Sequence, residues 1–183
     1  AKVAVERKIL TQKNKVDYHP TILRFATAFG VAPRMRFDLT VNQFTRDLHL
    51  GKNLLVYDAD TWRPYCHVKD FAEIIYRVLV APVDKVSFQV FNAGGDLNNY
   101  TKRMIVNVIL KYIPSGLITY RSQGQDPRNY KVNFSKMRDN LGFEPMYSIE
   151  EGVSELLSKL KDGFYDEVDK DQKFYGNYEI SYP

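Results

Sequence analysis

Apolar residues recur along the chain with two different spacings. Where they return every three or four positions they predict helices, over residues 1–10, 39–50, 68–80, 98–112, 135–141 and 149–160. Continuous or alternating apolar runs predict strands, over residues 21–30, 54–57, 87–95, 117–122 and 129–135. A short extended run between Arg63 and His67 leads into the helix over 68–80. Strands that alternate with helices of this length indicate βα units, so the fold class is α/β with a parallel sheet.

Capping residues set several of these boundaries. Asp38 is placed to cap the helix over 39–50, and Gly51 to end it. Asp70 lies near the start of the next helix, where a negative charge is favourable. The strands over 21–30 and 87–95 both end in glycine, and open α/β sheets bind ligands at the carboxyl ends of their strands. Neither GxGxxG nor GxxxxGK[ST] occurs, so the sequence lacks the loops that cradle a dinucleotide or a triphosphate.

The first helix has no residue that could cap its start. Its helical period begins at Ala1, and residue 1 is not methionine. We therefore expect the chain to have been cut from something longer. A length of 183 residues suits one domain, or one domain plus a fragment of another.

Charge is distributed unevenly along the chain. The net charge is +4, but residues 162–183 hold six acidic side chains against two lysines, which leaves +8 on residues 1–161. A basic body suits an anionic partner such as nucleic acid, a membrane surface or a phosphorylated small molecule, whereas scattered solvated lysines and arginines are the simpler interpretation. No apolar run is long enough to span a bilayer.

The single cysteine, Cys66, excludes an internal disulfide, which fits a reducing cytoplasm. We expect it to be a buried packing thiol, because no histidine or asparagine is placed in sequence to activate it. His67 follows it, but the sequence offers no second cysteine or suitably spaced histidine, so we predict no metal site. His67 is expected to be a half-buried strand residue with a hydrogen-bonded ring.

The first six residues, AKVAVE, resemble the end of a Tyr-x-x-x-Lys helix followed by small and apolar residues and a glutamate. That motif is typical of the extended short-chain dehydrogenases/reductases, the NAD-dependent nucleotide-sugar epimerase/dehydratase family. The resemblance makes Lys2 the catalytic and cofactor-binding lysine, with its tyrosine four residues earlier, outside this chain. A lysine one helical turn away lowers the phenol pKa, so that the phenolate can act as a base.

Three further segments resemble the same family in the expected order. LRFATAFG resembles L-R-x-x-N-x-Y-G, with Thr27 at the position that commonly contacts the nucleotide sugar. The stretch over 54–70 resembles V-Y-G-x-G-x-x-x-R-D-x-x-x-V-x-D, which places Tyr57 near the base and Arg63 on the diphosphate. Residues 126–145 resemble D-x-R-x-Y-x-x-D-x-x-K-x-x-x-x-L-G-[WF]-x-P, which places Asp126 and Arg128 on the same nucleotide.

Some residues depart from the family pattern or lie outside it. Asp58 and Asp60 replace glycines, and Pro64 replaces the usual aspartate, so a nonstandard substrate fits this sequence. Arg36 lies in the loop before a helix, where it suits either a phosphate contact or a solvated loop charge.

The resemblance implies an organisation for the whole chain. Residues 1–161 correspond to the last two strands and helices of a Rossmann-like parallel sheet, interleaved with a small α/β substrate-binding domain, and 162–183 form an acidic, tyrosine-rich tail. The family's cofactor-binding half has no counterpart here. NAD or NADP is therefore expected in the parent enzyme and none on this chain, and homodimerisation is implied through the helix that Lys2 ends.

The leading hypothesis is the substrate-binding portion of an NAD(P)-dependent nucleotide-sugar epimerase/dehydratase that transfers a hydride reversibly at a sugar carbon. Its partner would be a nucleotide-diphosphate sugar, without nucleic acid or membrane, in the cytoplasm. The alternative is a non-catalytic nucleotide-sugar-binding or regulatory module. Nucleic-acid binding is a third hypothesis, although the sequence has no aromatic-basic interleaving or known RNA or DNA motif.

Overall fold

The computed structural model describes residues 1–122 and 128–169. Its α-helices are α1 (Lys2–Leu10), α2 (Thr40–His49), α3 (Val68–Val80), α4 (Val83–Val86), α5 (Lys102–Leu110), α6 (Ser135–Leu141) and α7 (Ile149–Lys161). Its strands are β1 (Thr21–Phe25), β2 (Thr27–Phe29), β3 (Leu54–Tyr57), β4 (Trp62–His67), β5 (Gln89–Ala93), β6 (Asn99–Thr101) and β7 (Ile118–Arg121). Short 3₁₀ helices cover Asp96–Asn98 and Asp166–Asp169.

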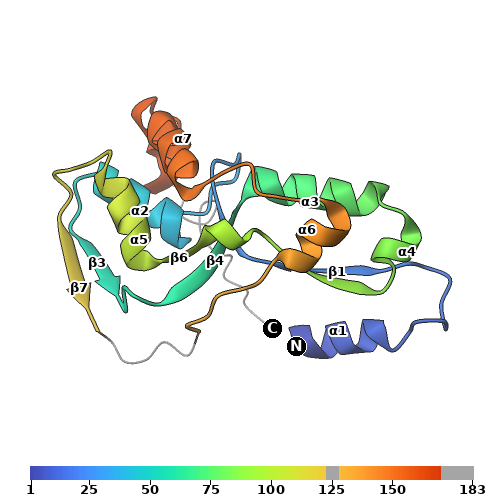
Figure 1. Ribbon diagram of the computed structural model, residues 1–183. Coiled ribbons are helices and arrows are strands. Elements are labelled where there is room, and N and C mark those ends of the chain that lie inside the picture. Colours follow the sequence, from blue (N-terminus) through green and yellow to red (C-terminus); the bar gives the residue numbers. More distant parts are fainter. Residues whose placement is uncertain (123–127, 170–183) are drawn as a thin grey trace, which may run out of the picture.

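The strands form small sheets in which parallel pairing dominates. β1 pairs with β5, β2 with β4, and β3 with β7, all in parallel, while β6 runs antiparallel to β4. The predicted α/β class with parallel strands is therefore confirmed. In Figure 1, β3 and β7 stand at one end of the molecule, and β1 lies at the other end between α1 and α3.

The strand predicted over 21–30 is two strands, not one. β1 pairs with β5 and β2 pairs with β4, and Ala26 between them donates its N–H to the carbonyl of Ala93. A continuous apolar run does not reveal that its two halves have different partners, which is why the sequence pattern merged them.

A smaller core joins β1 and β5 to α3 and α6. Its buried members are Cys66, Ile74, Val86, Phe91, Ala93, Met137 and Phe143. On the other face of β1, α1 buries none of its residues and is linked to the strand by an ion pair between Glu6 and Arg24. The sheet at this end is therefore covered closely on one face and lightly on the other (Figure 1).

A larger core lies among α2, α5, α7 and strands β2, β3 and β4. Tyr165, from the segment predicted as a tail, is buried in this core, where it packs edge-on against Phe37 and donates its hydroxyl hydrogen to the carbonyl of Ala32. The acidic segment thus contributes a core residue before residue 170. The division of the chain into 1–161 and 162–183 stays a prediction.

Two predicted elements differ from the structure near β6. The helix expected over 98–112 begins at Lys102, because Asn99–Thr101 pair with β4 first and Thr101 then caps the helix by accepting the N–H of Met104. Residues 129–135, which were expected to form a strand, do not form one in the structure. Asn99 bonds both the N–H and the carbonyl of Val132, so a side-chain amide takes the place of a neighbouring strand.

Asp38 does not cap its helix as predicted, and Asp70 makes contacts beyond its predicted place near a helix start. α2 begins after Leu39, and Asp38 instead pairs with Arg36. Asp70 is fully buried near the start of α3, where its carboxylate accepts the N–H groups of Met146 and Tyr147 at 3.1 and 3.3 Å. It lies in the first turn of α3, as predicted, and also joins α3 to the link that leads into α7.

Candidate functional site

Strand β4 brings two of the predicted site residues onto one face of a sheet. Thr27 of β2 stands opposite Tyr65 of β4, and Arg63 lies two residues before Tyr65. Side chains that share a register position, or lie two apart in a strand, point to the same face. Burial raises the pKa of Tyr65, whereas its hydrogen bond with Thr40 and the charge of Arg63 act to lower it. Arg63 is therefore close enough to interact electrostatically with the Tyr65 hydroxyl.

The segment that follows Arg128 packs directly against the start of β4. The N–H of Trp62 donates to Asn129 Oδ1 at 2.8 Å, and the N–H of Tyr130 donates to the carbonyl of Trp62 at 3.2 Å. The Arg63 guanidinium lies 5.3 Å from the centre of the Tyr130 ring. The structure therefore places Arg63 next to the segment that directly follows Arg128, although Arg63 and Arg128 are 65 positions apart in the sequence.

The Arg63 side chain is also held from its own strand, since its guanidinium donates to the carbonyl of Trp62 at 2.8 Å. Lys131 lies 3.6 Å from the centre of the Trp62 ring, which adds a further positive charge at this edge. A guanidinium fixed in direction is suited to bidentate, charge-assisted bonds to phosphate oxygens.

Tyr57 closes β3 with its side chain 36% exposed. Its carbonyl accepts a hydrogen bond from the Lys102 ammonium at 2.7 Å, and its register partner is Arg121 of β7. The sequence reasoning did not find Lys102. The signal that could have found it is a pair of cations, Lys102 and Arg103, in the first turn of a helix, where the macrodipole disfavours positive charge.

The two aspartates at usual glycine positions shape the turn between β3 and β4. Asp58 adopts a left-handed backbone conformation, with φ of 48°, and its carbonyl accepts from Thr61. Asp60 forms a two-point ion pair with Arg103 at 2.7 and 2.9 Å, which lowers the pKa of Asp60. Arg103 in turn lies 4.4 Å from the centre of the Tyr120 ring. These contacts fasten the turn to α5.

The remaining predicted residues lie outside this group of contacts. Arg36 forms a two-point ion pair with Asp38 at 2.6 and 2.5 Å, and this bond lowers the pKa of Asp38 against the effect of partial burial. Lys2 is exposed at the start of α1. Asp126 lies outside the described residues. The site roles of all three stay predictions.

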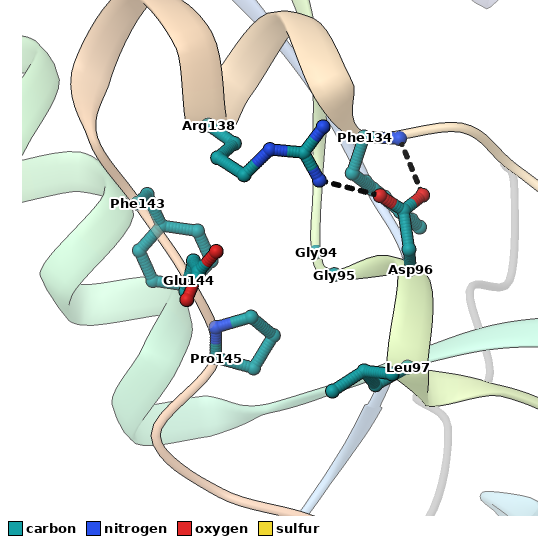
Figure 2. A pocket seen from close by; sticks show the side chains of 9 residues that line it. All are labelled: Gly94, Gly95, Asp96, Leu97, Phe134, Arg138, Phe143, Glu144 and Pro145. Carbon is teal, nitrogen blue, oxygen red and sulfur yellow. Dashed lines mark hydrogen bonds and ion pairs between the residues drawn. The ribbon is translucent and has the colours of Figure 1, made fainter.

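A pocket of about 110 Å³ opens where Gly94 and Gly95 follow the end of β5 (Figure 2). The Asp96 carboxylate accepts from the N–H of Phe134 at 2.9 Å and pairs with Arg138 at 3.1 Å. A Cβ on Gly95 would meet Pro145 Cγ at 1.9 Å, so the backbone passes too close for any other residue. Asp96 and Arg138 pair with each other across this pocket and Glu144 adds a negative charge, which makes it a weaker site for a nucleotide than the surface around Arg63.

The neighbouring residues Cys66 and His67 are structural. Cys66 is buried, and burial raises the pKa of its thiol, so it stays protonated and packs, as predicted. His67 is fully buried, not half-buried, but its ring is hydrogen-bonded as expected. Its Nδ1 accepts the N–H of Lys69 at 3.2 Å and its Nε2 lies 3.1 Å from Glu155 Oε2. Within residues 1–122 and 128–169, no three acidic, histidine or cysteine side chains gather closely enough to hold a metal ion.

In the described part of the chain, no helix is both long and apolar enough to cross a bilayer. This finding agrees with the lengths of α3 and α7, the longest helices there, at 13 residues each.

Known proteins resemble this chain in sequence. UDP-glucuronic acid decarboxylase 1 of Arabidopsis thaliana is 27% identical over 171 residues, covering 88% of this chain and 38% of the decarboxylase. UDP-glucuronate 4-epimerase of Thermodesulfobacterium geofontis is 22% identical, covering 78% of this chain and 43% of the epimerase. The chain therefore spans about two fifths of the length of these curated relatives.

Solved structures share the fold. UDP-glucose 4-epimerase from Thermotoga maritima, determined with UDP-glucose, superposes with a TM-score of 0.76 at 20% identity, covering 89% of this chain and 52% of the epimerase. dTDP-glucose 4,6-dehydratase from Bacillus anthracis gives a TM-score of 0.71 at 24% identity and covers 90% and 50%. The model of the NAD dependent epimerase/dehydratase family matches residues 1–94, half of the sequence. The resemblance in the sequence motifs is thereby confirmed, and the chain belongs to the NAD-dependent epimerase/dehydratase family.

Proposed function

We propose that this chain is the substrate-binding portion of an NAD(P)-dependent nucleotide-sugar epimerase/dehydratase, and that the surface around Arg63 holds the diphosphate of a nucleotide sugar. Relatives in sequence and fold act on UDP-linked or dTDP-linked sugars according to their names. The family alone leaves open which surface binds. The contacts around β4 support this location.

The observation that carries the proposal is the packing of residues 129–131 on Trp62 and Arg63. Two hydrogen bonds fix this segment next to an arginine already oriented by a main-chain carbonyl. Arg128 immediately precedes the segment, so its main chain lies close to this surface, and in the proposed site its guanidinium would join that of Arg63 there. Planar guanidinium groups bind phosphate oxygens in pairs of charge-assisted hydrogen bonds, which is the recognition that a diphosphate requires.

The neighbouring aromatic and polar residues extend this surface in two directions. On one side the exposed ring of Tyr57 offers a stacking face for a base. On the other side Thr27 shares the sheet face of Arg63 and would meet the sugar. In the parent enzyme, binding energy from base and diphosphate would hold the sugar carbon in position for hydride transfer.

The residues of this chain do not fit a complete NAD site. The sequence contains no glycine-rich loop for the pyrophosphate, and Lys2 is its one residue assigned to the cofactor by the family motif. NAD(P) would supply the hydride acceptor in the parent enzyme. We derive no hydride step from this chain and assign it substrate binding.

Calorimetric titration of the 183-residue protein with UDP-, dTDP-, CDP- and GDP-sugars, and then with NAD, tests the proposal. We expect binding of at least one nucleotide sugar and none of NAD. Arg63→Ala should weaken that affinity by about 1–3 kcal/mol through the loss of a charged hydrogen bond. Arg7→Ala, which removes an exposed arginine from α1, is the matched control and should leave the affinity unchanged.

Three results would each count against part of this assignment. Unchanged affinity in Arg63→Ala would remove Arg63 from the site. Failure to bind any nucleotide sugar, with tight, salt-sensitive binding of oligonucleotides, would favour a nucleic-acid-binding protein. Binding of a nucleotide sugar by a parent protein that shows no hydride transfer would favour the alternative, a non-catalytic binding or regulatory module.

A further inference from the structure

Lys102 is the first residue of α5, and its side chain reaches back to the end of β3. The ammonium donates to the carbonyl oxygen of Tyr57 at 2.7 Å, across 45 positions of sequence. Lys102 thus stands at the edge of the surface on which we place the base. It belongs to no motif identified in the sequence.

The position of Lys102 is electrostatically unfavourable for the helix. α5 has two cations, Lys102 and Arg103, and no acidic residue in its first turn, where the macrodipole favours negative charge. Asp60 compensates the charge of Arg103 through a two-point ion pair. Among the described residues, the hydrogen-bond partner of the Lys102 ammonium is a neutral carbonyl oxygen. An uncompensated cation at this point suggests that an external acceptor completes its surroundings.

Tyr57, whose main-chain carbonyl binds this ammonium, has an exposed side chain. Along β3, Leu54 and Val56 are buried, whereas Leu55 and Tyr57 are exposed, so the ring of Tyr57 lies on the outer face of the β3–β7 pair. At the end of the strand, the Tyr57 carbonyl is already engaged by Lys102. The end of β3 therefore offers a ligand a hydrogen-bond donor, the Lys102 ammonium, because the main-chain acceptor of Tyr57 is already occupied.

Resting on the proposed function, we propose that Lys102 selects nucleotides whose pyrimidine has a carbonyl oxygen at C4, uracil or thymine, over cytosine, which has an amino group there. A base stacked on Tyr57 would present its C4 substituent to the Lys102 ammonium. An ammonium can only donate, so it bonds the O4 carbonyl and leaves the cytosine amino group without an acceptor. Cytosine would instead turn its amino donor towards the ammonium donor, and this mismatch weakens the binding of a cytosine nucleotide.

Other charged residues lie near the end of β3. Asp60 is engaged by Arg103, and Arg121, the register partner of Tyr57, adds a second donor. Asp58 follows Tyr57 directly and is the group with the opposite preference, since a carboxylate would accept from the cytosine amino group. The proposal therefore predicts that Lys102, not Asp58, dominates the choice of base.

Titration of the protein with UDP and CDP, which differ at the C4 position of the base, measures this selectivity directly. We expect UDP to bind about tenfold or more tightly than CDP, the ratio that corresponds to one charge-assisted hydrogen bond. Lys102→Met should weaken UDP binding and bring the ratio close to one, whereas Lys102→Arg should retain a preference for UDP.

Lys111→Met is the matched control, because it removes the same charge from the other end of α5, where Lys111 pairs with Glu150. It should leave both affinities and their ratio unchanged. Asp58→Asn, at a left-handed position that asparagine tolerates, should also keep the preference for UDP.

Equal binding of UDP and CDP by the wild-type protein would overturn the proposal without any variant. A UDP preference that survives Lys102→Met, or that is lost in Asp58→Asn, would also overturn it, since Lys102 would then act only as a tie between β3 and α5. Each of these three outcomes leaves the proposed function intact, because UDP still binds. If neither UDP nor CDP binds, the proposed nucleotide site itself fails, and the inference with it.

Discussion

At the scale of single residues, His67 shows how one ring can join three elements. Its Nδ1 accepts a main-chain N–H at the start of α3, its Nε2 faces Glu155 of α7, and its ring stacks on Tyr147 at 4.5 Å. Because Nδ1 acts as an acceptor, the proton of the neutral ring belongs on Nε2, where Glu155 can accept it. A second proton on Nδ1 would break the bond to Lys69.

Protonation of His67 should therefore destabilise the fold. Burial lowers the pKa of His67 more than the neighbouring Glu155 raises it, so the unfolded chain, with a pKa of about 6.5, takes up the proton first. Its contribution to the free energy of unfolding is fully present above that pH and is lost as the pH falls towards the folded pKa. Burial alone would raise the pKa of Glu155, but the bonds from Lys69 and His67 outweigh it, so Glu155 stays charged through this window.

Denaturant unfolding of the wild type and of His67→Gln, from about pH 8 down to about pH 5, tests this linkage. We expect His67→Gln to reduce the free energy of unfolding by about 1–3 kcal/mol at the upper end, through the loss of its buried hydrogen bonds. The difference between the two proteins should shrink as the pH falls. A difference that is constant across the range would show that burial does not shift this titration.

At the scale of elements, Asn99 replaces a strand. Its side chain bonds both main-chain groups of Val132 and so holds the segment that follows Arg128. Asn99→Ala should lower the free energy of unfolding by about 1–3 kcal/mol, because two main-chain groups lose their partner. It should also weaken nucleotide-sugar binding, since residues 129–131 carry the contacts to Arg63. Asn140→Ala, which removes a similar amide from the exposed side of α6, is the control for binding. Full affinity in Asn99→Ala would disconnect this segment from the site.

The packing of α7 on β2 depends on Gly152. A Cβ at this position would lie 2.5 Å from Cε2 of the buried Phe29 ring. Alanine raises helix propensity by about 1 kcal/mol relative to glycine, whereas overpacking a well-filled core costs about 1–3 kcal/mol. We therefore expect Gly152→Ala to lower the melting temperature. Ser154→Ala, on the exposed side of the same helix, gains propensity without a clash and should not. Equal or higher stability of Gly152→Ala would show that Phe29 can move aside.

The same elements show what the sequence could predict. The apolar stripe of α3 defined Val68–Val80 to the residue, because a long, regular period fixes a helix. β6 was missed because Asn99–Thr101 is too short to show a period. Residues 129–135 alternate like a strand, but the main-chain groups of Val132, Asn133 and Phe134 bond side chains, which no local pattern encodes. Arg63 stood out beside aromatic residues, whereas the role of Lys102 depends on a contact across 45 positions.

At the scale of the whole molecule, β4 passes between two hydrophobic cores. Tyr65 belongs to the larger core and the adjacent Cys66 to the smaller one. The smaller core packs β1 and β5 under α3 and α6, and the larger one packs α2, α5 and α7 together. The surface proposed for the diphosphate lies at the start of this shared strand.

If the two cores open separately, matched core substitutions will have local effects. Ile74 and Ile105 are both fully buried, one in each core, and each Ile→Val change removes one methylene at about 0.5–1.5 kcal/mol. Native-state hydrogen exchange should then show faster exchange in β5 and α6 for Ile74→Val, and in α2 and α7 for Ile105→Val. Equal acceleration throughout the protein in both variants would show one cooperative unit. In that case nucleotide binding, which contacts the shared strand, should protect both cores equally.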